Sequence, residues 1–163
     1  MNTISNFAVK ETTGEYRQAT SQEIIDKARS LLKNRFRQGA SIKDQQAVRD
    51  YLYAHLADKD VEVFAVLYLD GQNRVIELRE HGQGTTNASS IYPAEIARGA
   101  LVMRACSVIL AHNHPSGGTN PSGQDVAVTN EIRNGLKLFG IKLLDHVICG
   151  SEVVSMQELG LIP

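Results

Sequence analysis

Two histidines and one aspartate in a short stretch of the chain carry side chains that transition metals prefer. His112 and His114 flank Asn113 at the end of an apolar run, residues 107–111. Side chains alternate between the two faces of a strand, so both imidazoles point to one face and Asn113 points to the other. Two imidazoles on one side of a strand end can share one metal ion.

The segment that follows can bring a carboxylate to this pair. Pro115 ends the strand, and a loop rich in proline, glycine and serine leads to a helix that starts near Ser122. Asp125 lies in the first turn of that helix, where its carboxylate can face back toward the strand end. Two imidazoles and one carboxylate leave a fourth position of a zinc tetrahedron open for water. The pattern therefore predicts a catalytic zinc site formed by His112, His114 and Asp125.

Each part of this pattern also has a purely structural interpretation. Ser122-x-x-Asp125 has the form of a helix capping box, in which both side chains bind backbone N–H groups. A His-x-His pair alone is common among ordinary polar residues. The combination favours the metal site, because hydrophobic side chains at the end of a buried strand would avoid the cost of burying two imidazoles.

Helices and strands alternate along most of the chain. Residues 1–19 are polar without periodicity, and we expect a loose lead-in there. The first helix should carry an apolar stripe formed by Ile24, Ala28, Leu31 and Leu32. We predict helices at 21–38, 41–57, 93–103 and 122–139, and strands at 61–69, 74–81, 107–114, 141–148 and 152–156. This order predicts an α/β fold with a mixed sheet, preceded by two N-terminal helices.

The composition excludes several classes of protein. The chain has 163 residues, 42% of them hydrophobic and 21% charged, which excludes a disordered, collagenous or coiled-coil chain. A formal net charge of -1 gives no general attraction to DNA or to an anionic membrane. No apolar run approaches the ~20 residues that span a bilayer, and no signal peptide is visible, so we expect a cytoplasmic protein. Two cysteines, Cys106 and Cys149, are too few for a disulfide framework and are expected in the core.

The motif resembles that of a known family. The segment His112-Asn113-His114-Pro115-Ser116-Gly117, followed by Pro121-Ser122 and Asp125, is similar to the metal motif of the RadC branch of the JAMM (MPN-plus) metalloproteases. The similarity extends over about residues 58–163. It implies an MPN/JAB-like (cytidine-deaminase-like) mixed sheet sandwiched by helices, with residues 1–57 as a helical leader. RadC proteins often carry an N-terminal helix-hairpin-helix region, and residues 1–57 show no glycine-rich hairpin of that kind.

The resemblance also implies an activity and roles for single residues. It implies a zinc-dependent hydrolase that cleaves a peptide or isopeptide amide bond with a metal-activated water. His112, His114 and Asp125 would be the ligands of Zn²⁺, and Ser122 would donate a hydrogen bond to the developing oxyanion. A zinc-bearing fold whose catalytic power is lost, like the metal-free MPN branch, is a third possibility, and the intact ligand set argues against it.

The resemblance further implies a glutamate general base upstream of the histidines. Glu80, a few residues before the Gly84-Thr85 pair, is our first choice and Glu77 the second. Many relatives place this glutamate one residue further from the Gly-Thr pair, where this chain has Arg79. Strand alternation puts Glu77 and Glu80 on opposite faces, so the two cannot exchange roles without a bulge.

The other histidines and a basic stripe complete the candidates. His146, after Asp145 on a late strand, is expected to be a hydrogen-bonded structural residue, His81 to face away from Glu80, and His55 to lie on the surface. A DNA-associated function is the alternative to hydrolysis, since RadC relatives carry a DNA-repair label. Its sequence basis is a basic stripe on the first helix, formed by Arg29, Lys33 and Arg37 with Lys27 and Arg35. No membrane partner is expected.

Overall fold

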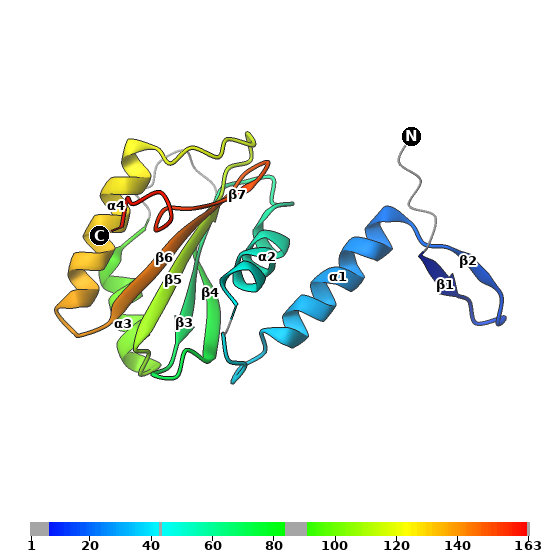
Figure 1. The fold of residues 1–163 in the computed structure, drawn as a ribbon, viewed down its shortest axis with the longest axis horizontal. Helices are drawn as coiled ribbons and strands as arrows, with labels where there is room; N and C mark the ends of the chain where they lie inside the picture. The colour runs from blue at the N-terminus through cyan, green and yellow to red at the C-terminus, as the bar shows by residue number, and fades with distance from the viewer. Residues whose placement is uncertain (1–6, 43, 84–90, 163) are drawn as a thin grey trace.

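The computed structural model describes residues 7–42, 44–83 and 91–162. In these residues a five-stranded sheet has the order β4-β3-β5-β6-β7 and carries helices on both faces (Figure 1). Only β5 and β6 run parallel; the other neighbours are antiparallel. The sheet strands are β3 (Val63–Leu69), β4 (Val75–Gln83), β5 (Ser107–Asn113), β6 (Lys142–Cys149) and β7 (Val153–Ser155). The predicted α/β class with a mixed sheet is confirmed, and the arrangement is consistent with a JAB/MPN-like fold.

The two inner strands explain why the sheet is covered on both sides. Every residue of β3 and of β5 is buried, as the nearly continuous apolar runs in the sequence predict. Helix α2 (Gln45–Leu56) packs on one face, and helices α3 (Pro93–Val102) and α4 (Gly123–Lys137) pack on the other. Side chains of β5 therefore enter one of two separate hydrophobic cores, depending on their parity.

Helix α2 belongs to this packed structure. Its buried side chains Ala47, Val48, Leu52 and Leu56 share a core cluster with apolar residues of β3, β5 and β6. The expected domain boundary between residues 57 and 58 falls between α2 and β3, two elements of that one core. The helix starts at Gln45, later than the predicted residue 41, because Asp44 caps it: the Asp44 side chain accepts a hydrogen bond from Gln46 N, 3.0 Å away.

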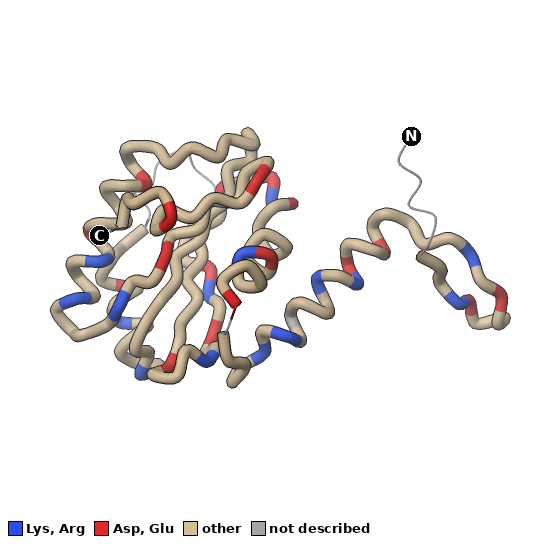
Figure 2. Tube along the Cα trace, viewed as in Figure 1, with Lys and Arg blue, Asp and Glu red and all other residues tan. Residues whose placement is uncertain are grey.

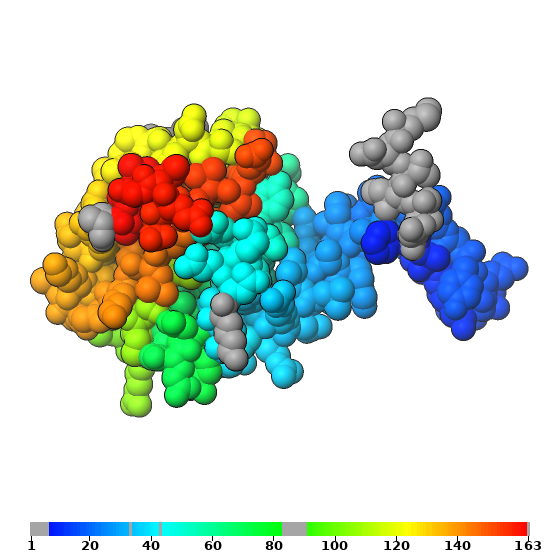
Figure 3. All heavy atoms as spheres, in the orientation of Figure 1, coloured from blue at the N-terminus to red at the C-terminus, as the bar shows by residue number. Residues whose placement is uncertain are grey.

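The N-terminal region projects from the packed domain as an arm (Figure 3). It consists of β1 (Ala8–Lys10), β2 (Tyr16–Gln18) and α1 (Ser21–Arg35). The loose lead-in expected for residues 1–19 is thus partly replaced by a short hairpin, whose turn contains Gly14 at φ +88°. The predicted apolar stripe of α1 is not covered: Leu31 is 58% exposed, and no described side chain of α1 is buried.

No helix in the described part of the chain is long and apolar enough to span a bilayer. Charged residues of both signs are spread over the domain and the arm (Figure 2). This mixed distribution agrees with the formal net charge of -1.

Candidate metal centre

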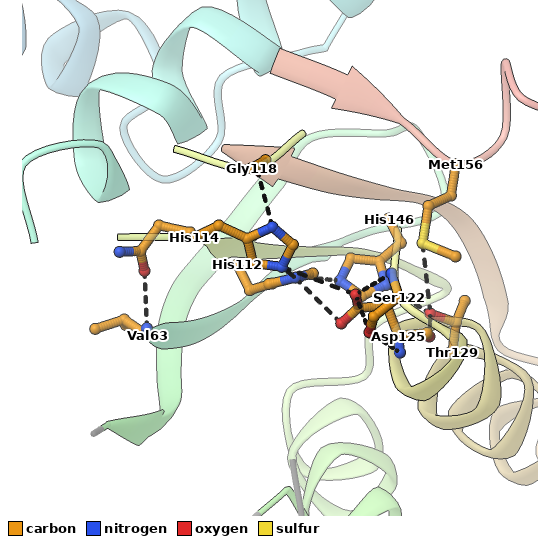
Figure 4. A network of polar contacts seen from close by, with 10 residues as sticks. Val63, His112, His114, Gly118, Ser122, Asp125, Thr129, His146 and Met156 are labelled. Atoms are coloured by element: carbon orange, nitrogen blue, oxygen red, sulfur yellow. Dashed lines mark hydrogen bonds and ion pairs between the residues drawn. The ribbon is translucent and has the colours of Figure 1, made fainter. Parts of the chain in front are cut away.

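Strand β5 presents its last side chains to opposite faces of the sheet. His114 continues the pairing beyond the strand, because its backbone N–H donates to Cys149 O at 3.0 Å. His112 and His114 therefore point to the α4 side together (Figure 4). Asn113 points to the α2 side, as do Ile109 and Ala111 of the same strand. There the Asn113 amide accepts from Val63 N (2.8 Å) and fixes the start of β3. The alternation predicted from sequence is confirmed, and the structural role of Asn113 is an addition to it.

Helix α4 supplies the carboxylate through its capping box. Ser122 is the N-cap residue, and Asp125 N donates to Ser122 Oγ at 3.1 Å. In return, Asp125 Oδ2 accepts from Ser122 N (2.7 Å) and from Ser122 Oγ (2.6 Å). The capping box is therefore present, and it does not exclude metal binding, because it occupies Oδ2 and leaves Oδ1 facing His112.

Three ligand atoms converge at this point. One ligand atom from each of His112, His114 and Asp125 lies within 4.8 Å of the others. His112 Nε2 is 2.9 Å from His114 Nε2 and 3.2 Å from Asp125 Oδ1. Around a tetrahedral zinc with bonds of about 2.0–2.1 Å, neighbouring ligand atoms are separated by about 3.3 Å. These two spacings lie within about 0.4 Å of that value, and His114 Nε2 lies 3.8 Å from the nearer contact on Asp125, Oδ2. The donor set therefore fits a zinc ion with small adjustments of the side chains.

The three side chains of the cluster differ in exposure. The side chain of His112 is 1% exposed, that of Asp125 10%, and that of His114 18%. Solvent and any substrate therefore approach from the side of His114. Three protein ligands are one fewer than a closed structural zinc site uses.

The carboxylate is held in its charged form. Burial by itself raises the pKa of Asp125, but the contacts with His112 and with the hydroxyl and backbone N–H of Ser122 lower it, and the balance lies well below the usual pKa of an aspartate. Asp125 is thus deprotonated, as a metal ligand must be, throughout the neutral range.

Behind the three ligands, a chain of hydrogen bonds runs through the buried layer (Figure 4). His112 Nδ1 lies 2.8 Å from His146 Nε2, and His146 Nδ1 lies 2.6 Å from Thr129 Oγ1. Thr129 Oγ1 in turn donates to the backbone oxygen of Asp125 at 2.5 Å. Burial, followed by the neighbouring His112, lowers the pKa of His146 well below its ordinary value. The prediction that His146 is hydrogen-bonded is confirmed.

Sequence analysis did not single out Thr129. The signal that could have found it is its spacing, since a residue four positions after Asp125 lies one helical turn further on the same face of α4. Its contact with His146 on β6 cannot be predicted from the local sequence, because the contact depends on how α4 packs on the sheet.

A model of the RadC-like JAB domain matches residues 42–161 of this chain. The chain belongs to this family. It is 42% identical over 150 residues to a UPF0758 protein of Polaromonas sp. strain JS666, an alignment that covers 91% of this chain and 67% of the relative. A UPF0758 protein of Vibrio cholerae is 38% identical over 151 residues, with 91% of this chain and 96% of the relative covered. A second Vibrio cholerae UPF0758 protein is 39% identical over 142 residues, covering 87% and 90% respectively.

In this RadC-like domain, Glu80 lies away from the three ligands. It is paired with Ala65, whose side chain belongs to the core on the α2 face. Glu80 Oε1 contacts His55 Nε2 at 2.9 Å and Lys59 Nζ at 3.3 Å. Glu80 is therefore not brought together with the three ligands, because the sheet separates its carboxylate from the face that carries His112. His55, expected on the surface, is half-buried in this contact.

Glu77 lies on the same face of the sheet as His112, but at a different position along the strands. It is paired with Tyr68, whereas His112 is paired with Phe64, four residues further along β3. Four residues of strand correspond to about 13 Å. The Glu77 carboxylate accepts from Arg79 Nε at 2.8 Å instead. The residue of β4 that lies level with His112 is Gly82, which has no side chain to offer.

His81 occupies the irregular position of β4 between Glu80 and Gly82. The register of β4 on β3 shifts there, since Phe64 pairs with Gly82 and Ala65 with Glu80. His81 Nε2 contacts the Tyr68 hydroxyl at 2.7 Å on the α3 side. It thus faces away from Glu80, as predicted.

A loop held close to β6 supports the second histidine. His114 Nδ1 contacts Gly118 O at 2.9 Å, and Ser151 N donates to Gly117 O at 3.0 Å. Gly150 makes this approach possible: a Cβ at that position would overlap the carbonyl oxygen of Gly118 and lie 2.8 Å from that of Gly117. The glycine permits a backbone-to-backbone contact that orients the His114 ring.

The two cysteines differ in exposure. Cys149 is buried, and burial raises the pKa of its thiol to about 12, so it stays protonated and unreactive. Cys106 is exposed, contrary to the expectation of two core thiols. It lies in the turn between α3 and β5, outside the covered part of the sheet.

Proposed function

We propose that this RadC-like domain is a zinc-dependent hydrolase of amide bonds in peptides or isopeptides. The observation that carries the proposal is the convergence of two imidazole nitrogens and one carboxylate oxygen at spacings of 2.9 and 3.2 Å around one accessible corner. Such a ligand set is typical of hydrolytic zinc sites. When bound there, zinc would supply a Lewis acid and a water molecule that ionises near neutral pH.

The chain's own residues would prepare this site in distinct ways. Ser122 holds Asp125 Oδ2 with two hydrogen bonds, so that Oδ1 remains directed at His112. His112 closes the inner wall, and the partly exposed His114 borders the opening through which an amide carbonyl would enter. The Ser122 hydroxyl can donate to a developing oxyanion only if it turns away from Asp125.

Glu80 is not part of the proposed machinery. Its carboxylate is held by His55 and Lys59 on the opposite face of the sheet.

The proposal is tested with zinc-loaded protein and a defined mixture of peptides, together with a lysine-linked isopeptide, analysed by mass spectrometry. We expect new termini with the wild type and with His55→Asn, and no cleavage with Asp125→Asn. His55→Asn is the matched control because it changes a histidine with a carboxylate partner on the other face. Equal cleavage by the wild type and Asp125→Asn, or no cleavage of any amide by zinc-loaded wild type, would contradict the proposed activity.

A DNA-binding function receives less support from the basic stripe. Arg29 Nη2 is paired with Asp58 Oδ2 at 2.7 Å, and Arg29 Nε donates to Ala54 O at 3.1 Å. These contacts join α1 to α2, so Arg29 serves the attachment of the arm rather than a phosphate. Hydrolysis therefore remains the single function that we propose.

A further inference from the structure

We propose that helix α1 pairs antiparallel with α1 of a second copy of this chain, around a two-fold axis at Ala28, and so forms a homodimer. The proposal does not depend on the metal centre. It starts from a helix face that the packed domain leaves uncovered.

The C-terminal half of α1 attaches the arm to the domain. Arg29 Nε donates to Ala54 O at 3.1 Å, and the ring of the C-cap residue Phe36 stacks on Tyr51 at a centroid distance of 4.8 Å. The N-terminal half continues away from the domain toward the β1–β2 hairpin (Figure 1). A helix of 15 residues is only marginally stable in water by itself, so packing against a partner would stabilise this half.

The apolar residues of α1 form a stripe that is open to solvent. Leu31 is 58% exposed and Ile25 43%, and Ala28 between them is exposed as well. Ile24 and Leu32 are half-buried. Spacings of three and four residues place all five on one side of the helix. Exposed apolar residues are common singly, whereas a contiguous apolar surface marks an interaction site.

This stripe is symmetric about its centre. Ala28 is the middle residue of the 15-residue helix, with Ile24 four positions before it and Leu32 four positions after it. Ile25 and Leu31 lie three positions before and after the same centre. An antiparallel pair that crosses there places Ile25 of one copy opposite Leu31 of the other, and likewise the outer two residues. A two-fold interface requires this kind of self-complementarity, and the small alanine lets the two backbones approach at the axis.

The charges of α1 favour the antiparallel orientation. The acidic residues Glu23 and Asp26 lie before the central alanine, and Lys27 adjoins it. The charged residues after the centre are all basic: Arg29, Lys33 and Arg35. An antiparallel pair brings the acidic half of each helix to the basic half of the other, whereas a parallel pair would align like charges.

A hollow beside α1 offers room for the second copy. It has a volume of about 430 Å³, and Leu32 lines it together with the apolar side chains of Tyr51, Ala54 and Leu78. In the antiparallel pair, Ile24 of the second copy lies opposite Leu32, at the border of this hollow. The second helix therefore covers apolar surface of α2 and β4 as well as the stripe itself.

The hairpin of the arm extends the same interface. Residues before the start of α1 in one copy lie beyond the end of α1 in the other, where Phe36, Ile42 and Ala47 line a smaller hollow of about 170 Å³. The hairpin region carries two exposed aromatic rings, those of Phe7 (56% exposed) and Tyr16 (70%). The antiparallel pair directs these rings toward the smaller hollow of the second copy.

Nucleic acid fits this helix less well than a second copy does. Arg29 Nη2 is paired with Asp58 Oδ2 at 2.7 Å, and Arg17 Nη2 with Glu23 Oε1 at 2.6 Å. These carboxylates neutralise two of the cations that would otherwise contact phosphates. The apolar stripe has no counterpart on a phosphate backbone.

Sedimentation velocity at about 1–100 µM, a range that covers weak and moderate dimers, provides the first test. We expect a dimer for the wild type and for the control Leu138→Glu, which places the same charge at an 83% exposed leucine beside α4. We expect Leu31→Glu to raise the dissociation constant of the dimer more than about 100-fold, because each dimer loses two buried leucines. Thermal melts report whether both variants keep the fold.

Site-specific cross-linking provides the second test and determines the orientation. Cys106 is first replaced by serine, since it is exposed, while Cys149 is buried. We expect Ala28→Cys to give a covalent dimer with a short thiol-specific cross-linker, because the two-fold axis brings the two thiols together. Ser21→Cys lies two turns away on the same face, and in the antiparallel pair its two copies are about 21 Å apart, beyond the reach of that reagent.

Four results would overturn the proposal. A monomeric wild type throughout this concentration range excludes the dimer, and if it retards a labelled DNA duplex, the arm belongs to nucleic acid instead. Equal dimerisation of the wild type and Leu31→Glu excludes the stripe as the interface. Equal cross-linking of Ser21→Cys and Ala28→Cys indicates a parallel pair, and no cross-linking of Ala28→Cys excludes the axis. If Leu31→Glu does not fold, the cross-linking results decide.

Discussion

Two histidine–carboxylate pairs lie at the same end of the sheet, on opposite faces. His112 and Asp125 lie on the α4 face, with side chains 1% and 10% exposed. His55 and Glu80 lie on the α2 face, with side chains 36% and 26% exposed. His55 of the second pair lines a hollow of about 430 Å³ next to α1, so water reaches this histidine.

The two pairs differ most in what surrounds them. On the α4 face a third ligand completes the set, Ser122 holds the carboxylate, and Thr129 and His146 fill the layer behind. On the α2 face Lys59 approaches Glu80 at 3.3 Å and supplies the positive charge that a metal ion would otherwise provide. Residue types alone therefore do not define a metal site; the second layer of contacts does.

The largest expected difference between the faces is in metal binding itself. At zinc concentrations about 100 times Kd, a bound ion adds about 2.7 kcal/mol to stability, which corresponds to a rise in melting temperature of roughly 5–10 °C for a domain of this size. We expect this rise, measured by calorimetry, in the wild type and in Glu80→Gln but not in Asp125→Asn. A rise of equal size in Asp125→Asn would remove the distinction between the two faces.

A core substitution on the α2 face should lower stability by a comparable amount without changing zinc binding. Leu52 on α2 is fully buried in the core of the opposite face. We expect Leu52→Ala to lower the free energy of unfolding by about 2–5 kcal/mol through the cavity it leaves. Zinc affinity, measured well below the melting temperature, should stay within about twofold of the wild type. A large loss of affinity would mean that the two faces are coupled through the sheet.

A smaller effect is expected where the loop meets β6. We expect Gly150→Ala to lower stability by about 1–3 kcal/mol, because the added methyl group must displace the loop backbone at Gly117 and Gly118. Since Gly118 O contacts the His114 ring, zinc affinity should also fall, by about tenfold. Gly123→Ala is the matched control, because no atom lies within 4 Å of a Cβ there. Unchanged zinc binding in Gly150→Ala would show that the loop does not orient His114.

We expect acid to lower the free energy of unfolding of the metal-free protein, because it protonates Asp125. Its folded-state pKa is depressed, so the stability that it contributes is present above the unfolded-state pKa of about 3.9 and is lost as the pH falls through the folded-state value. We expect Asp125→Asn to cost on the order of 2 kcal/mol at pH 7, with the difference from the wild type shrinking below about pH 4. Urea unfolding without metal at both pH values measures this. A constant difference would assign the cost to altered packing.

The smallest expected effect is that of a substitution in the more exposed pair, His55 and Glu80. Glu80→Gln removes a charge that is shared with His55 and Lys59 at a partly solvated position. We expect less than about 1 kcal/mol in stability and unchanged zinc affinity. A loss of zinc binding here would restore Glu80 to the metal centre and contradict the placement described above.

The parts that could be predicted from the sequence depend on local geometry. His112, His114 and Asp125 lie within one strand–loop–helix unit, where strand alternation and the capping box at Ser122 determine their directions. The buried strand β3 was similarly visible as an apolar run. In each case the relevant constraint acts over a few neighbouring residues.

The parts that could not be predicted depend on contacts between distant segments. Alternation showed that Glu77 and Glu80 face opposite ways, but not which of them shares a face with His112. That choice is set by the register of β4 on β3 and of β3 on β5, including a shift at Phe64 and Ala65. The contact of Thr129 with β6 also arises only when α4 packs on the sheet.

The uneven exposure of the three ligands has a consequence for how fast the site fills and empties. An incoming cation meets His114 and Asp125 before the enclosed His112, so loading proceeds in an order, and the last bond forms deepest. Departure must reverse that order past His114, whose ring contacts Gly118 O in the 115–121 segment. Exchange rates should therefore report on the movements of this segment, even where the equilibrium affinity does not change.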